Sequence, residues 1–391
     1  MNLDAVQTYL RDQKIDAWLI YDFRGSNAVL SQLLSGIKPS TRRAMLLIPA
    51  GGEPTLLLHP LDRHQFPEGP VRREFYAGWV DLRDWLAKRL SGMARVAMEY
   101  SPGAALPVVG IVDAGTVELI RSLGVDVCSS ANLIQVGVAR WSANALEKHL
   151  VASKRVAEAK DSAFDLIRKS LAANRTLLET DVQRHILDRF SAAGLQWPDD
   201  PIVAVNAHAG DPHYEPSAKT PTPIRRDDWV LIDLWARIPG DENIYSDITW
   251  VGYAGASVSA EHRRVFEIVK AARDAAVERA RQAWQRKERL EGWQLDEAAR
   301  AVIIHAGFGH AIKHRTGHSL SPGPKVHGLG VNLDNLETHD TREVLAGIGY
   351  TVEPGIYLPE FGVRLEINVF TDPKDGPRVT SCVQDEIVML G

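Results

Sequence analysis

The chain has 391 residues, of which 45% are hydrophobic and 24% are charged, and this balance is typical of a soluble protein with two domains. Its net charge of -5 gives no electrostatic basis for binding nucleic acid or an anionic membrane, so neither is expected as a partner. The 2 cysteines are far apart, which argues against a disulfide framework or a zinc knuckle.

The chain begins with MNLDAVQTYLRDQK, which lacks the apolar core of a signal peptide, and no later run reaches the ~18 apolar residues of a membrane span. We therefore expect a cytoplasmic protein. The next stretch alternates short strands and helices. Strands are expected at Ala17–Tyr21, Ala44–Ile48, Thr55–His59 and Arg95–Tyr100, and helices at Val80–Leu90 and Val112–Leu123. This alternation predicts a compact α/β domain over residues 1–140.

A long amphipathic helix, at about 143–172 with Ser142 as its N-cap, follows this domain. From there the pattern of helix, helix and hairpin occurs twice. Helices at 143–172 and 179–194 precede the first pair of strands, and helices at 259–289 and 295–306 precede the second. The repeat predicts a duplicated α+β domain over residues 141–391, with its two hairpins side by side.

The first hairpin, in LIDLWARIPGDENIYSDITW, carries Asp233 and Asp247 in its strands. The strands are expected at Val230–Trp235 and Ile244–Val251, on either side of the turn-forming PGDEN. A turn centred on Gly240 predicts that the two aspartates face each other, with Cβ atoms about 5 Å apart. At an effective dielectric of about 20, their charges repel by roughly 3 kcal/mol. A shared proton, a nearby Lys or Arg, or a bound cation must offset this repulsion and the cost of burial.

The second hairpin, in IGYTVEPGIYLPEFGVRLEINVF, carries Glu353 and Glu366. A turn around Pro359 and Glu360 places these two acids near opposition as well. Arg364 lies on the same strand face as Glu366 and can pair with one acid, but not with four. Four clustered carboxylates therefore favour divalent metal, and two ions rather than one, because such a cluster can bridge ions about 3.5–4 Å apart.

Histidines gather just before the second hairpin, in HAIKHRTGHSLSPGPKVHGLG. Metal sites built on carboxylates usually include an imidazole. His318 follows an amphipathic helix and precedes a glycine-rich stretch, which suits a side chain that projects into a cleft. His314 is interpreted as a helix residue that packs behind His318.

Together these stretches resemble the pita-bread-fold metallopeptidases, a family that includes Xaa-Pro dipeptidase (prolidase), Xaa-Pro aminopeptidase, methionine aminopeptidase and the non-metal enzyme creatinase. The motifs PHYEP, LIDLWA, YSDITW, HRTGHS, TVEPGIY and GVRLE occur in family order. The segment IDAWLIYDF resembles the extra N-terminal domain of the Xaa-Pro peptidases and creatinase. The resemblance implies a creatinase/prolidase-type domain at 1–140 and a pita-bread catalytic domain at 141–391.

The resemblance implies five metal ligands, which are Asp233, Asp247, His318, Glu353 and Glu366. In the family pattern, Asp247 and Glu366 bridge two ions, Asp233 completes one site, and His318 and Glu353 complete the other. Oxygen ligands with a single imidazole suit Mn²⁺, with Co²⁺ or Zn²⁺ as alternatives.

Catalytic roles follow from the same resemblance. Glu353 is expected to take a proton from the attacking water and deliver it to the prolyl nitrogen. His213 of PHYEP and His327 of VHG match the family's substrate-contacting histidines, and are expected to donate hydrogen bonds to the oxyanion and the substrate backbone. His208 is a second choice for the role of His213.

The sequence departs from the family pattern in two loops. Asp233 and Asp247 are separated by a longer loop than in most members, and the excess is assigned to a solvent-side PGDEN turn. The stretch SLSPGPKV between His318 and His327 is two residues longer than the pattern. For this reason His339 is an alternative to His327.

The expected activity is hydrolysis of the Xaa-Pro bond in a small proline-containing peptide. The SPGPK loop is stiffened by its prolines and supplies Lys325 as a cation for a substrate carboxylate, with Arg364 and Arg342 as further candidates. This favours dipeptides as substrates, with Xaa-Pro aminopeptidase activity on longer peptides as the alternative. A creatinase-like amidinohydrolase and a peptide-binding pseudoenzyme are disfavoured, because both lose metal ligands that are present here. The resemblance also implies a homodimer.

Overall fold

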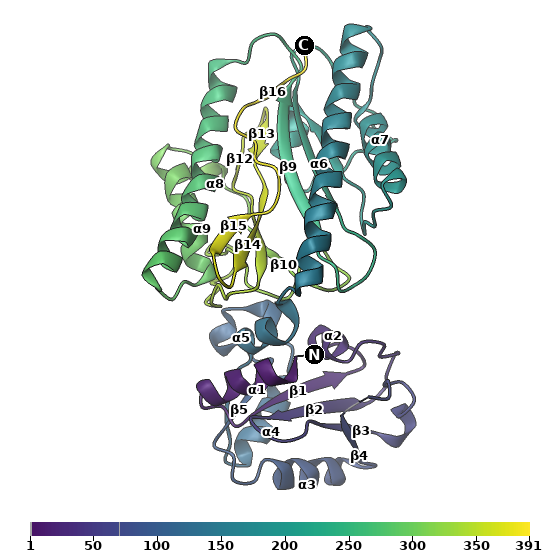
Figure 1. The fold of residues 1–391 in the computed structure, drawn as a ribbon, viewed down its shortest axis with the longest axis vertical. Coiled ribbons are helices and arrows are strands. Elements are labelled where there is room, and N and C mark those ends of the chain that lie inside the picture. The colour runs from purple at the N-terminus through teal and green to yellow at the C-terminus, as the bar shows by residue number, and fades with distance from the viewer. Residues whose placement is uncertain (1, 70) are drawn as a thin grey trace. The chain divides into compact units, whose positions relative to one another are not determined.

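The computed structural model describes residues 2–69 and 71–391, and the chain divides into two compact units, Met1–Ala139 and Arg140–Gly391 (Figure 1). This division lies one residue before the boundary expected after residue 140. Among the described residues, none of the helices combines the length and the apolar character that crossing a bilayer requires.

The first unit consists of short alternating elements around one sheet. Its helices and strands are α1 (Leu3–Asp12), β1 (Ala17–Phe23), α2 (Ala28–Leu33), β2 (Arg43–Pro49), β3 (Thr55–Leu58), η1 (Pro60–Asp62), β4 (Arg72–Phe75), α3 (Trp79–Arg89), β5 (Arg95–Met98), η2 (Pro102–Ala104), η3 (Pro107–Val109), α4 (Ala114–Ser122), β6 (Asp126–Ser129), α5 (Ala131–Ile134) and η4 (Gln135–Ala139). The sheet order is β4-β3-β2-β1-β5-β6. Every expected strand and helix of this unit is confirmed to within two residues.

The second unit carries the duplicated pattern. Its helices and strands are α6 (Ala143–Ala172), α7 (Glu179–Ala192), β7 (Ile202–Val205), η5 (Asn206–Gly210), β8 (Trp229–Ala236), β9 (Ser246–Tyr253), α8 (Ala260–Arg286), α9 (Gly292–His305), η6 (Gly309–Ala311), β10 (Ser319–Leu320), β11 (Gly349–Val352), β12 (Gly355–Tyr357), β13 (Gly362–Arg364), β14 (Ile367–Asp372), β15 (Gly376–Val379) and β16 (Val388–Met389). The Ser142 side chain caps α6 by accepting a hydrogen bond from the Ala145 amide, as expected.

The predicted repeat is confirmed, and each repeat forms a four-stranded sheet, with two strands more than the expected pair. Helices α6 and α7 precede β7 and the hairpin β8–β9, while α8 and α9 precede β10 and the pair β11 and β14. The added strands β7 and β10 each pair antiparallel with the first strand of the following hairpin. Short strands β12 and β13 form a separate pair between β11 and β14.

Strand alternation explains where the core lies and why β8 carries an acid. Val230 and Ile232 of β8 are buried against α6 and α7, whereas Trp229 and Leu231 belong to the apolar cluster beneath α8 and α9. Asp233 lies on the same face of β8 as Trp229 and Leu231, and its side chain lines a cavity. The acid therefore sits on a strand face that is apolar at one end and polar at the other.

The register of the first hairpin differs from the expected one. Asp233 pairs with Thr249, and Asp247 pairs with Trp235, so the two aspartates are diagonal neighbours and not directly opposed. The prediction was wrong by two residues, because β8 extends to Ala236 and moves the turn centre beyond Gly240. A two-residue shift keeps both side chains on the same face. At a diagonal separation of about 7–8 Å, their repulsion falls from roughly 3 to about 2 kcal/mol.

The loop between β8 and β9 is also less exposed than expected. The side chain of Arg237 is 1% exposed, and Asn243, Ile244 and Tyr245 are buried. Only the tip, with Asp241, extends into solvent. The expectation of a solvent-side turn was therefore correct for the tip alone.

The second hairpin has the expected register. Val352 pairs with Ile367 in the β11–β14 ladder, and Gly355 pairs with Arg364 in the β12–β13 ladder. Glu353 and Glu366 lie between the two ladders at matching positions, so their predicted opposition is confirmed.

Candidate metal centre

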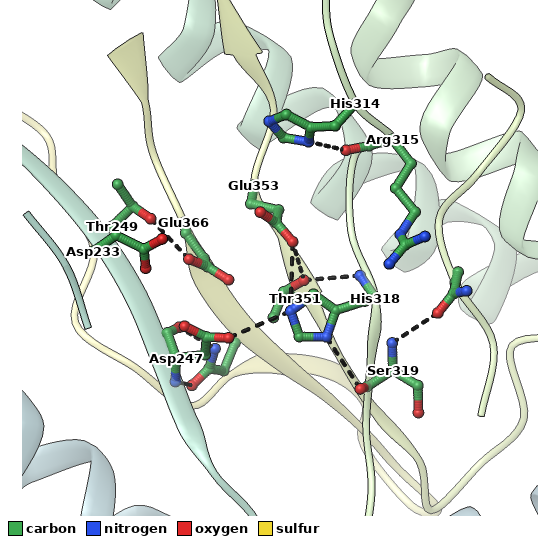
Figure 2. A network of polar contacts seen from close by, with 12 residues as sticks. Asp233, Asp247, Thr249, His314, Arg315, His318, Ser319, Thr351, Glu353 and Glu366 are labelled. Carbon is green, nitrogen blue, oxygen red and sulfur yellow. Dashed lines mark hydrogen bonds and ion pairs between the residues drawn. The ribbon is translucent and has the colours of Figure 1, made fainter. Parts of the chain in front are cut away.

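A cavity of about 510 Å³ opens where the two hairpins meet. Its walls contain all five expected metal ligands, both expected substrate histidines, and two of the three candidate cations. The lining residues are Pro198, Asp199, Ile202, Pro212, His213, Asp233, Trp235, Asp247, His314, Arg315, His318, Pro324, Lys325, Val326, His327, Glu337, Glu353, Arg364 and Glu366. Figure 2 shows the acids and His318 pointing toward one another from strands of both repeats.

Strands β9 and β14 bring Asp247 and Glu366 together from different repeats. The Asp247 amide donates a hydrogen bond to Asn368 Oδ1 over 3.1 Å, and the Glu366 amide donates to Thr249 O over 3.2 Å. Thr249 Oγ1 donates to Glu366 Oε2 over 2.9 Å. Because these bonds fix both backbones, carboxylate oxygens of Asp247 and Glu366 and a nitrogen of His318 lie within 4.8 Å of one another.

Asp233 is held by a buried cation. Arg364 forms an ion pair with Asp233 Oδ2 and donates to Thr249 Oγ1 over 3.0 Å and to Tyr357 Oη over 3.0 Å. The Tyr357 hydroxyl in turn donates to His314 Nε2 over 2.5 Å, since His314 Nδ1–H is used on the Arg315 carbonyl. A continuous hydrogen-bond chain therefore runs from Asp233 to His314.

This chain includes two residues to which the sequence analysis gave no role in the site. Tyr357 lies two residues beyond Gly355, which pairs with Arg364. The register of the hairpin was therefore sufficient to predict that Tyr357 lies near Arg364. His314 is not helical, and it lines the cavity instead of packing behind His318. The interpretation of His314 was therefore wrong, because the helix ends at His305, well before this residue.

His318 presents a ring nitrogen to the acids. Its Nδ1–H donates to the Ser319 carbonyl over 3.2 Å, which leaves Nε2 facing Asp247 Oδ2 at 3.3 Å and Glu353 Oε1 at 3.5 Å. Burial holds the pKa of His318 well below its usual range, so the ring is neutral and Nε2 carries a lone pair. A lone pair directed at carboxylate oxygens requires a proton on one of those oxygens or a cation between them.

Burial also dominates the protonation of the four acids. It raises the pKa of Asp233, with Arg364 opposing the shift. It also raises the pKa values of Asp247 and Glu366 well above the usual range, and the charges of neighbouring acids add to this effect. Burial raises the pKa of Glu353 to about 7. Without a further cation, the protein therefore holds protons on this cluster.

Two observations show that the cluster fits divalent metal. Within residues 2–69 and 71–391, the buried oxygens Asp233 Oδ1 and Glu366 Oε1 have no hydrogen-bond partner, which is costly unless a cation takes that place. The His318 ring has the arrangement of a metal ligand, with one nitrogen fixed on a backbone carbonyl and the other free. Four carboxylates and one imidazole suit Mn²⁺, Co²⁺ or Zn²⁺.

The expected substrate histidines and their alternatives lie in different places. His213 and His327 both line the cavity, and the His327 ring lies 3.9 Å from that of His318. His339 packs against Trp293 and hydrogen-bonds Asn335, outside the cavity wall. The two extra residues before His327 therefore do not displace it from the site.

His208, the second choice for the role of His213, is part of a supporting cluster. Its ring stacks on Tyr214 at 4.0 Å, and its Nδ1–H lies 3.0 Å from the buried Glu179. The Tyr214 hydroxyl donates to the same carboxylate over 2.5 Å. Glu179 thereby ties down the loop that carries His213.

The candidate cations differ in availability. Lys325 is exposed and lines the cavity. Arg364 is 4% exposed and is engaged with Asp233. Arg342 is 1% exposed and forms an ion pair with the buried Asp340 over 2.5 Å, so its assignment to a substrate carboxylate was wrong. Arg315, which the sequence analysis did not single out, lines the cavity and lies 3.3 Å from Glu337.

Comparison with known proteins gives one consistent result. The model of metallopeptidase family M24 matches residues 147–373. A relative from Staphylococcus saprophyticus, named uncharacterized peptidase SSP1059, is 26% identical over 388 residues, which cover 97% of this chain and 99% of that protein. The Xaa-Pro dipeptidase of Lactobacillus delbrueckii subsp. lactis is 28% identical over 246 residues, 62% of this chain and 61% of that protein.

A solved structure is similar over nearly the whole chain. The crystal structure of dipeptidase PepE from Mycobacterium ulcerans gives a TM-score of 0.71 at 22% identity, and the match covers 99% of this chain and 96% of that one. The expected α/β domain and pita-bread domain are therefore the fold of this chain.

Proposed function

The chain belongs to metallopeptidase family M24, and on that basis we propose that it is a dinuclear-metal dipeptidase that hydrolyses the Xaa-Pro bond of dipeptides. The observation that carries the proposal is the convergence of three buried carboxylates, the half-buried Glu353 and His318 on one cavity of about 510 Å³. This volume is in the range of small-ligand sites. The similarity to a protein named Xaa-Pro dipeptidase supports the substrate class.

Asp233, Asp247, His318, Glu353 and Glu366 are the residues that would hold the ions, with Mn²⁺ as the favoured metal. Bound metal supplies Lewis acidity and lowers the pKa of water, so that a nucleophile is available at neutral pH. The remaining steps belong to side chains of the chain itself.

Glu353 is suited to move the proton. Its side chain is 14% exposed and lines the cavity. Thr351 Oγ1 donates to Glu353 Oε1 over 3.0 Å and fixes the carboxylate. In the proposed reaction Glu353 accepts a proton from water as the water oxygen attacks the carbonyl carbon. It returns that proton to the prolyl nitrogen as the C–N bond breaks.

His213 and His327 line the cavity wall, which supports the proposal that they contact the substrate. Each would donate an N–H to the oxygen that becomes negative during attack, or to the substrate backbone. Ordered donors of this kind lower the barrier because they need no reorganisation as charge develops.

Lys325 supports the preference for dipeptides. A dipeptide ends in a carboxylate one residue beyond the scissile bond, and Lys325 lies exposed on the wall of the same cavity. A longer peptide places a neutral amide there and leaves the cation without its partner, which favours the shorter substrate.

Hydrolysis of a small peptide panel tests the proposal. Xaa-Pro dipeptides, Xaa-Pro-Xaa tripeptides and Xaa-Ala dipeptides are compared with and without Mn²⁺. We expect Mn²⁺-dependent cleavage of Xaa-Pro dipeptides, with kcat/KM about tenfold or more above that for tripeptides. Equal or faster cleavage of tripeptides would identify an aminopeptidase, and preference for Xaa-Ala would remove proline from the specificity.

A further inference from the structure

The two loops that depart from the family pattern contact each other. The first joins β8 to β9 over residues 237–245, and the second is the segment 322–326, which follows β10. The Gly323 amide donates a hydrogen bond to the Asp241 carbonyl over 2.7 Å, and the Tyr245 hydroxyl donates to the Pro324 carbonyl over 3.3 Å. The two extensions therefore form one substructure beside the cavity.

Arg237 lies at the centre of this contact. Its side chain is 1% exposed, and its Nη1 donates to the Gly323 carbonyl over 2.5 Å and to the Asn243 carbonyl over 3.3 Å. Its Nη2 donates to Asp241 Oδ1 over 2.6 Å, and its guanidinium lies 4.5 Å from the centre of the Tyr245 ring. One planar, buried cation thus fixes both loops at once.

The segment that Arg237 holds forms part of the cavity wall. Pro324, Lys325 and Val326 line the cavity, whereas Arg237 does not. Gly323 has a φ of 138°, a conformation that residues with a side chain rarely adopt, so the loop takes a specific shape at the point where Arg237 binds it. Arg237 does not touch the cavity itself, and its bond to the Gly323 carbonyl is the contact through which it can act on segment 322–326.

We propose that Arg237 is a positioning residue that fixes segment 322–326 at the cavity, and that by placing Lys325 it sets the preference for a substrate with a free carboxylate. The identity of that substrate rests on the proposed function. The position of segment 322–326 is independent of the proposed function, because it follows from contacts within the protein.

Two measurements on the metal-loaded full chain test this proposal. The first is hydrogen exchange at Gly323, whose amide is a specific reporter because Pro322 and Pro324 have no amide N–H. Arg237→Lys keeps the charge but loses the planar fork, and we expect exchange at Gly323 to become about tenfold faster or more. Arg263→Lys, on the exposed surface of α8, is the matched control and should leave exchange unchanged.

The second measurement compares an Xaa-Pro dipeptide with the same dipeptide as its C-terminal amide. In Arg237→Lys we expect KM for the dipeptide to rise about five- to tenfold with kcat within about twofold, and the preference over the amide to fall by the same factor. Lys325→Met should lose the preference in the same way. The double variant should lose no more of the preference for the free carboxylate than Lys325→Met alone, because both changes act through the side chain of Lys325.

The results separate this proposal from the dipeptidase proposal. If the wild-type enzyme cleaves dipeptide and amide equally, the dipeptidase proposal fails, and the role of Arg237 is then judged by exchange at Gly323 and by KM for the peptide that is cleaved. If Arg237→Lys does not fold, Asp241→Ala removes the side-chain acceptor of Arg237, and Tyr245→Phe removes the hydroxyl bond to Pro324, so these two variants test the same substructure. Unchanged exchange and unchanged KM in the folded variants, or a loss confined to kcat, would overturn the proposal.

Discussion

Replacing Glu353 by Gln in metal-free protein should stabilise the fold at neutral pH. Burial raises the pKa of Glu353 from 4.5 to about 7. Because the folded-state pKa lies above the unfolded-state value, the folded protein holds the proton more tightly. The contribution of Glu353 to the free energy of unfolding is therefore complete below pH 4.5, and is lost as the pH rises through about 7. Gln at this position stays neutral at every pH, so its contribution to the free energy of unfolding does not fall as the pH rises.

The size of the effect follows from the difference between the unfolded-state and folded-state pKa values of Glu353. The difference between 4.5 and about 7 corresponds to about 3 kcal/mol. For a unit of this size, that amounts to a shift of about 6–12 °C in melting temperature. We therefore compare the free energies of unfolding of Glu353→Gln and the wild type. We expect the difference, variant minus wild type, to increase by about 3 kcal/mol between pH 4.5 and pH 8.

Urea unfolding in the presence of chelator at pH 4.5, 6 and 8 measures this difference. Taking a difference between variants removes the opposing contributions of buried histidines such as His149 and His314, whose pKa values burial lowers to about 4 and about 3. Glu267→Gln, on the exposed surface of α8, is the control and should give a flat profile. A flat profile for Glu353→Gln as well would refute the reasoning, since Glu353 would then titrate as it does in the unfolded chain.

Three further outcomes are expected. Chelation should abolish turnover and lower the melting temperature, because metal at a hundredfold excess over its Kd adds about 2.7 kcal/mol; full turnover by protein shown to hold no metal would contradict this. With metal present, Glu353→Gln should reduce kcat by about 10²–10⁴ while the protein remains folded, and a near-normal rate would assign the proton transfer elsewhere. We also propose a homodimer, which light scattering at working concentration tests; a fully active monomer would exclude it.

Much of the site was predictable because its acids lie on strands or directly beside them. Side chains in a strand alternate between two faces, so Asp233 and Asp247 stay on one face whichever even register the hairpin adopts. The turn at Pro359 and Glu360 was short enough to fix the opposition of Glu353 and Glu366 directly. Local rules therefore sufficed to place the carboxylates.

Other features depend on contacts between distant segments. The register of the first hairpin was missed because β8 pairs with β9 as far as Ala236, and the loop beyond it makes contacts with distant residues such as Gly323. The role of His314 was missed because its partner, Tyr357, lies on a strand that follows it by about forty residues. Strand β4 was not predicted because its sequence RREF is mostly charged, and it forms the edge of its sheet.

The duplication itself explains why so many acids are buried together. In each repeat one face of the sheet is covered by that repeat's own helices, and the polar part of the other face carries two acids. The pair of acids in either repeat alone would be exposed to solvent. Hydrogen bonds between Asp247 and Asn368, and between Thr249 and Glu366, hold the two polar faces together. The arrangement concentrates negative charge that a single arginine, Arg364, cannot balance. Stability and catalysis should therefore depend on the same cations, so that a substitution which weakens metal binding lowers both the turnover and the rise in melting temperature that added metal produces.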